Sequence, residues 1–171
     1  MQIVLQSCVV RSWDWRDCDD IVRHANNRNV WINLRDRFPH PYKKKDAQTW
    51  LDIVVGARPE NNFAIAVNDK AVGGIGFSVQ TDVGHRSAEI GYWLGEEYWG
   101  RGIVTQALVA VSEYAFSHHD ICRLYAHVFE WNPASVRVLE KASYVFEGRL
   151  KKSVTKDGKT IDQLIYARTI D

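Results

Sequence analysis

The hydrophobic residues of this chain recur with two periods, and segments of the two kinds follow one another along the sequence. Alternating or short continuous apolar runs between turn-forming residues predict strands. Apolar residues three and four positions apart predict helices that bury one face. The expected strands are residues 3–11, 63–67, 71–79, 86–94, 122–129, 144–154 and 160–169.

Helical spacing is found in five segments. The expected helices are one that begins at Asp14, one over residues 30–37, one capped by Asp46, and the segments 103–118 and 132–141. Residues 38–41 interrupt this pattern, because each of the two prolines there disfavours a helix at the residue before it. We expect this break to form the wall of a cleft.

Turn signals connect several of these elements. The dipeptide Asn68-Asp69 suits a tight hairpin between two strands, and Asp157-Gly158 suits another near the end of the sequence. Strands alternate with helices elsewhere, which predicts a mixed α/β arrangement. A length of 171 residues is typical of one domain, so we expect residues 1–171 to form a single domain.

A glycine-spaced turn precedes the longest predicted helix. Gly100 and Gly102 allow a tight backbone turn, and the helix that begins near Ile103 adds unpaired N–H groups and a positive dipole end. This arrangement favours an anionic phosphate ligand. Ile103-Val104 replace the Lys-Ser/Thr pair of a nucleotide-hydrolysing loop, and Thr105 follows without the third glycine of a dinucleotide fingerprint. The alternative is a plain strand-to-helix turn.

Several ordered stretches carry a more specific signal than the glycines alone. They are Val72-Gly73-Gly74-Ile75-Gly76, Ala88-Glu89-Ile90-Gly91-Tyr92-Trp93-Leu94, Tyr98-Trp99-Gly100-Arg101-Gly102 with Thr105-Gln106-Ala107, Asn132-Pro133-Ala134-Ser135 with Val138-Leu139-Glu140-Lys141, and upstream Pro41-Tyr42, Asp46-Ala47 and Trp50-Leu51. In this order they resemble the GNAT acyl-coenzyme A transferase superfamily, and specifically its RimJ/RimL-type branch. The resemblance implies a GNAT-type α/β fold whose central, mostly antiparallel sheet of six or seven strands is splayed at the cofactor cleft and flanked by helices.

The resemblance also implies a cosubstrate, acetyl-CoA, and no metal. The corresponding Asn132 would hydrogen bond an amide of the pantetheine arm, although capping of the following helix alone would explain an asparagine here. Trp99 is expected to pack as an anchor of the loop as well. The residues expected to hold acetyl-CoA are Tyr92, Trp93, Leu94, Trp99, Gly100, Arg101, Gly102, Ile103, Val104, Thr105 and Asn132.

Acyl transfer to an amine requires a neutral amine and a proton source for the departing thiolate. Glu89 lies in the middle of a core-like strand, so we expect burial to raise its pKa and fit it to act as the base. The alternative is that Glu89 pairs with an arginine or caps backbone N–H groups. His85 is expected to be an exposed residue without a catalytic role. The resemblance implies that Ser135 lies near the thioester sulfur as a proton donor.

Three positions depart from the family pattern. Leu139 replaces a tyrosine that donates the proton in many members, which leaves Ser135 or water as the acid. Glu97 replaces Gln or Arg three residues before the first glycine, which puts one diphosphate contact in doubt. Ser143 stands where the branch usually has glycine, so its backbone must tolerate the conformation of that turn.

The acceptor is expected to bind beside the proline-broken aromatic segment. Our candidates for that wall are Trp31, Leu34, Phe38, His40 and Tyr42. The resulting function is transfer of an acetyl group from acetyl-CoA to a primary amine by direct attack. A protein or peptide N-terminus and a small amine both remain as acceptors. A non-catalytic module that binds or senses acyl-CoA is the alternative function.

Composition limits the other partners. The chain has 22 Lys and Arg against 21 Asp and Glu, a net charge of +1, so no overall field attracts nucleic acid or an anionic membrane. Cys8, Cys18 and Cys122 are scattered, which indicates neither a disulfide framework nor a zinc site. We expect a cytoplasmic protein with no signal peptide and no membrane span, and a homodimer is one open alternative for its assembly.

Overall fold

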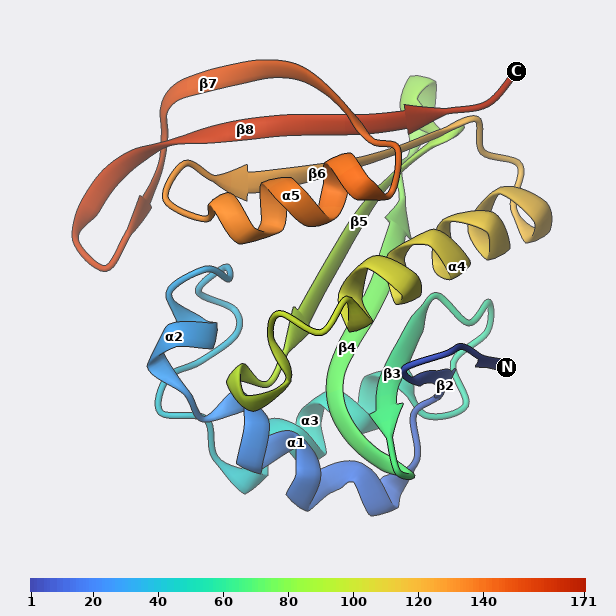
Figure 1. Ribbon diagram of the computed structural model, residues 1–171, viewed down its shortest axis with the longest axis vertical. Helices are drawn as coiled ribbons and strands as arrows, with labels where there is room; N and C mark the ends of the chain where they lie inside the picture. Colours follow the sequence, from blue (N-terminus) through green and yellow to red (C-terminus); the bar gives the residue numbers. More distant parts are fainter.

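The computed structural model describes residues 1–171, and its eight strands form one sheet in the order β1-β2-β3-β4-β5-β6-β8-β7 (Figure 1). All neighbours are antiparallel except β5 and β6, which run parallel. The strands are β1 Gln2–Val4, β2 Val9–Ser12, β3 Asn62–Val67, β4 Lys70–Val79, β5 Ser87–Leu94, β6 Arg123–Phe129, β7 Val145–Lys156 and β8 Lys159–Thr169. The helices are α1 Cys18–Ala25, α2 Arg28–Trp31, α3 Lys44–Val54, α4 Ile103–His118 and α5 Pro133–Lys141.

The mixed α/β fold is confirmed, and the sheet has one strand more than the upper expectation of seven. The single strand expected over residues 3–11 is wrong, because the chain turns back between Val4 and Val9 to form β1 and β2. This turn contains no glycine, proline or asparagine. It is held by tertiary contact, since the side-chain oxygen of Gln106 in α4 accepts from the Ser7 backbone N–H at 3.2 Å.

The helix expected over residues 30–37 is also wrong. Helix α2 begins earlier, at Arg28, because the Asn27 side chain caps the N–H groups of Asn29 and Val30. It ends at Trp31, and the rest of the segment forms turns. The expected helix at Asp46 begins at Lys44 instead, and the Asp46 carboxylate accepts from the Lys43 backbone N–H at 2.8 Å.

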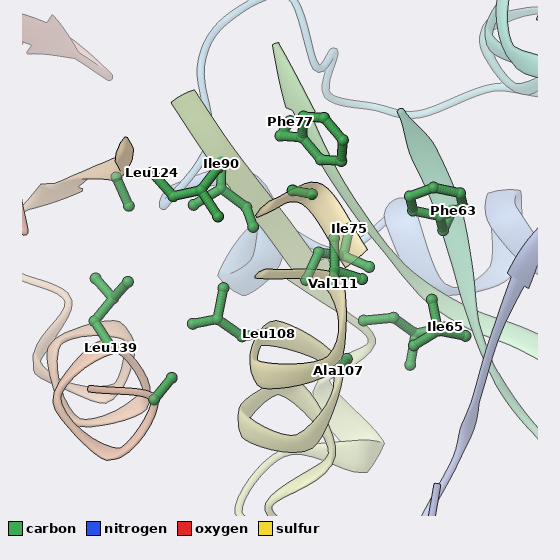
Figure 2. Packing of buried hydrophobic residues seen from close by; sticks show 14 of the residues in the cluster. Phe63, Ile65, Ile75, Phe77, Ile90, Ala107, Leu108, Val111, Leu124 and Leu139 are labelled. Carbon is green, nitrogen blue, oxygen red and sulfur yellow. The ribbon is translucent and has the colours of Figure 1, made fainter. Parts of the chain in front are cut away.

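Each side of the sheet carries its own apolar core. Residues Phe63 and Ile65 of β3 pack with α4 and α5, whereas the intervening Ala64 packs with α1 and α3. This division follows from the two-residue period of a strand. Figure 2 shows the α4 side, where Leu108 and Val111 lie against the sheet and α5 contributes Leu139.

The two central strands separate part-way along their length. Strands β5 and β6 pair only over residues 87–89 and 123–125. Beyond Glu89, the β5 backbone has β4 on one edge and no strand partner on the other. The expected splay is therefore present, and it exposes backbone polar groups of residues 90–94 to a ligand.

Candidate active site

One cleft of about 1080 Å³ runs along the splay between β5 and β6. It is lined by both candidate catalytic residues, Glu89 and Ser135. It is also lined by every residue expected to hold acetyl-CoA: Tyr92, Trp93, Leu94, Trp99, Gly100, Arg101, Gly102, Ile103, Val104, Thr105 and Asn132. Segments that are separate in the sequence thus border a single cleft.

The turn before α4 presents free backbone donors to this cleft. Gly100 and Gly102 have φ values of +75° and +73°, a region that L side chains rarely adopt, and no protein atom lies within 4 Å of a Cβ built on either glycine. The Gln106 N–H donates to the Gly102 carbonyl at 3.1 Å, so the N–H groups of residues 103–105 precede the first helical bond. These donors and the dipole of α4 suit a diphosphate.

The acidic residues before the turn, Glu96 and Glu97, both contact residues of the segment around α1 and α2. Glu96 accepts from Asn27 and Asn29 at 2.7 and 2.8 Å, and Glu97 pairs with Arg23 at 3.4 Å and lies 3.3 Å from His24 Nδ1. Both carboxylates therefore tie the loop to the segment around α1 and α2. The Trp99 indole N–H donates to the Leu94 carbonyl at 2.8 Å, which anchors the loop as expected.

At the start of α5, Asn132 caps the helix by accepting from the Ser135 backbone N–H at 3.1 Å. The Ser135 hydroxyl lies 2.8 Å from the hydroxyl of Tyr92, which reaches across from β5. Burial raises the pKa of Tyr92, so this phenol stays protonated at neutral pH. Two hydroxyl groups in contact therefore border the cleft.

Glu89 lies between two cationic or ionisable side chains. Its Oε1 atom accepts from the Arg35 guanidinium and lies 3.0 Å from His127 Nδ1. The bond from His127 and the charge of Arg35 hold the pKa of Glu89 below its ordinary value, against the opposing effect of burial. The expected rise in the pKa of Glu89 is wrong, and the pairing with an arginine is present.

The acceptor wall is only partly as expected. Leu34, Phe38 and Tyr42 line the cleft, whereas Trp31 and His40 do not and stack on one another at 5.5 Å. Phe38 packs against Tyr42 and also against Trp93, whose indole lies on the side of Glu89. Trp93 fits there because Gly74 has no side chain: a Cβ at Gly74 would lie 2.8 Å from the indole nitrogen.

The sequence matches the acetyltransferase (GNAT) domain family over residues 8–145. The chain belongs to the GNAT acetyltransferase family. This acetyltransferase is 32% identical to the uncharacterized N-acetyltransferase p20 of Bacillus licheniformis over 92% of its own length and 90% of that protein. It is 33% identical to the ribosomal-protein-serine acetyltransferase of Escherichia coli strain K12, over 64% of this chain and 60% of that protein.

Solved structures agree with the fold. RimL, a ribosomal L7/L12 alpha-N-protein acetyltransferase solved in complex with coenzyme A, superposes with a TM-score of 0.85 at 23% identity, over 99% of this chain and 97% of that one. Family membership makes this protein an acetyl-CoA dependent N-acetyltransferase. None of its helices has the length and apolar composition needed to cross a membrane.

Several ionisable residues that line the cleft of the acetyltransferase were missed from sequence, among them Arg35, His127, Arg137 and Lys141. Arg137 and Lys141 lie one turn apart on α5 and line the cleft, a spacing that a helical projection would have revealed. His127 shares the face of Glu89, because Tyr125 pairs directly with Glu89 and side chains two apart on a strand point the same way. Arg35 lies outside any helix or strand, so no sequence periodicity predicts which way its side chain points.

Proposed function

We propose that this enzyme transfers the acetyl group of acetyl-CoA to the N-terminal α-amine of a peptide or protein. The observation that carries the proposal is the single cleft that joins the phosphate-binding turn, the Ser135 hydroxyl and the Glu89 carboxylate. A nucleotide-like anion, a thioester arm and an amine must be bound in one continuous space for direct transfer to occur. Acetyl-CoA, when bound, supplies the activated acetyl group.

We assign a role to the residues of each part of the cleft, beginning at the phosphate-binding turn. The backbone of residues 100–105 binds the diphosphate, supported by the positive charges of Arg101, Arg137 and Lys141 on the cleft wall. Asn132 and the unpaired edge of β5 hold the pantetheine arm. Ser135 donates a proton to the departing sulfur, and Tyr92 hydrogen bonds to Ser135.

The acceptor class is supported by the shape and charge of the cleft beyond Glu89. The cleft continues along α3, β3 and β4, where it is lined by Asp46, Thr49, Trp50, Ile53, Asn62 and Ser78. This extension offers room for residues that follow an N-terminal amine. Asp46 and Glu89 are the two acidic residues of the lining, and Glu89 is already paired with Arg35. A polyamine would require more free carboxylates to bind its several charges.

Thiol release from acetyl-CoA, measured with a panel of acceptors, tests the proposal. The panel contains a peptide with a free N-terminal serine, the same peptide with a blocked N-terminus and an added lysine, and spermidine. We expect turnover with the free N-terminus and at least a tenfold lower kcat/KM with the other two. Preference for spermidine would identify a small-amine enzyme instead. Binding of acetyl-CoA without thiol release for any acceptor would support the non-catalytic alternative.

A further inference from the structure

His127 is the ionisable side chain best placed to take a proton from the acceptor. It is on β6, on the same sheet face as Glu89, and it lines the cleft. Its one hydrogen bond joins Nδ1 to Glu89 Oε1 at 3.0 Å. An ionised carboxylate only accepts hydrogen bonds, so Nδ1 carries the hydrogen and the lone pair of a neutral ring lies on Nε2. The carboxylate therefore fixes the tautomer, as it does in a Ser-His-Asp triad.

We infer that His127 is the general base of this acetyltransferase and that Glu89 is the positioning residue that orients it. The inference rests on the proposed function. A base works best when its pKa lies near the operating pH, and imidazole is the side-chain group whose ordinary titration range is closest to neutrality. Glu89 is less suited to be the base, because Arg35 and His127 both occupy its Oε1 atom and its pKa is lowered.

The proton and electron balance is complete without another reactant. The acceptor ammonium gives one proton to Nε2 of His127, and the nitrogen lone pair that this frees forms a bond to the carbonyl carbon of the thioester. The carbon–sulfur bond then breaks, and its electron pair leaves with sulfur. The second proton lost by nitrogen balances the one that sulfur gains, and the imidazolium returns its proton to solvent.

The surroundings of His127 can carry the positive charge that this step creates. Glu89 on β5 faces the imidazolium directly, while Arg35 offsets part of the negative charge of Glu89. A second pocket, of about 340 Å³, meets the cleft at His127. The other charged or titratable groups that face this region are Asp36 and Arg37 of the segment between α2 and α3, Tyr125 of β6 and Lys156 of β7.

The pH profile of kcat/KM for the peptide acceptor tests the inference in wild type and in His127→Asn, which keeps an amide donor near Glu89 but has no basic nitrogen. We expect about a 10²–10⁴-fold loss at neutral pH. The loss should shrink as pH rises and the amine deprotonates unaided, and added imidazole should restore part of the rate. KM for acetyl-CoA should stay within about threefold. His85→Asn is the matched control and should behave as wild type.

Glu89→Gln separates the two possible bases. If His127 is the base, Glu89→Gln lowers the plateau of the profile because the ring is no longer oriented, and the acidic limb is still present. If Glu89 itself is the base, Glu89→Gln abolishes the limb while His127→Asn keeps it, and the inference is overturned. A wild-type rate and profile in His127→Asn would also overturn it. Absence of thiol release by wild-type enzyme with every acceptor would instead refute the proposed function, and the inference with it.

Discussion

Position 139, where many family members have a tyrosine, is a leucine in this chain. The hydroxyl group next to Ser135 comes from Tyr92 instead. Leu139 is fully buried in the core between α4, α5 and the sheet, so it cannot serve the cleft. The Tyr92 hydroxyl approaches the same region from β5 and lies 2.8 Å from Ser135 Oγ. In the proposed mechanism, Tyr92 would therefore support Ser135 as the proton donor, although the two residues are 43 positions apart.

Variants of Ser135 and Tyr92 should distinguish the proposed proton donor, Ser135, from its hydrogen-bond partner, Tyr92. We expect Ser135→Ala to lower turnover by about 10–10³-fold with the affinity for acetyl-CoA within about threefold, because a transition-state donor adds little to ground-state binding. Tyr92→Phe should lower turnover by about 2- to 10-fold, the equivalent of one neutral hydrogen bond. Turnover and melting temperature are measured together. Full turnover of Ser135→Ala with a lowered melting temperature would identify water as the acid.

The lowered pKa of Glu89 predicts a pH-dependent contribution to stability. A carboxylate whose pKa is depressed in the folded state stabilises that state above its unfolded pKa, about 4.3, and loses this contribution as pH falls through the folded value. Glu89→Gln should therefore melt at a lower temperature than wild type at pH 7, and the gap should narrow as the pH is lowered below about 4. A gap of constant size from pH 7 to pH 3 would contradict this assignment.

At the level of elements, the positive-φ glycines before α4 make its N-terminus accessible. Valine at Gly102 meets no protein atom within 4 Å of its Cβ, so its effects come from the strained backbone and from the space that a phosphate would occupy. We expect Gly102→Val to weaken coenzyme A binding by about 1–3 kcal/mol in calorimetry while the protein still folds.

Gly56 provides a control for backbone strain alone. It also has a positive φ, +78°, with no protein atom within 4 Å of a Cβ, but it lies between α3 and β3 and does not line the cleft. Gly56→Val should lower stability by a similar amount and leave the coenzyme A affinity unchanged. Equal affinity in both variants would remove the basis for a phosphate site at this turn.

At the level of the whole molecule, the β7–β8 hairpin lies at one end of the sheet and contacts the segment that carries the proposed acceptor wall (Figure 1). Lys156 at the end of β7 is 2% exposed, donates to Asp36 at 2.8 Å, and has its ammonium 3.7 Å from the centre of the Trp31 ring. Arg28 of α2 pairs with Asp157 in the hairpin turn at 2.6 Å. The turns that carry Leu34 and Arg35 therefore depend on the last two strands for their position.

Lys156→Ala should remove the contacts of the hairpin with Asp36 and Trp31. We expect a loss of about 1–3 kcal/mol in the free energy of unfolding, because a cation–π contact and a buried aliphatic chain are removed together. KM for the acceptor should rise more than KM for acetyl-CoA, since Lys156 contacts Asp36 and Trp31, whereas Asn29 of α2 keeps its own hydrogen bond to Glu96 beside the phosphate-binding turn. Lys151→Ala, an exposed position on the same strand, is the control. An unchanged acceptor KM in Lys156→Ala would show that the wall holds its position without the hairpin.

The sequence by itself determined the features whose causes are local. Examples are the bounds of α4, the Asn132 cap, and the hairpin turns at Asn68-Asp69 and Asp157-Gly158, which follow from propensity, capping and periodicity within a few residues. The ordered motifs were sufficient to identify the family. They also selected candidate cofactor-binding residues, all of which line one cleft.

Only the tertiary structure decided which charges meet. Arg35 and Glu89 are 54 positions apart, Glu89 and His127 are 38 apart, and Asp36 and Lys156 are 120 apart. No local pattern links such pairs, since their approach depends on sheet order and on how the segment between α2 and α3 folds across the cleft. The pKa of Glu89 was predicted in the wrong direction for this reason: burial is visible in a strand pattern, whereas the partners of a buried charge are not.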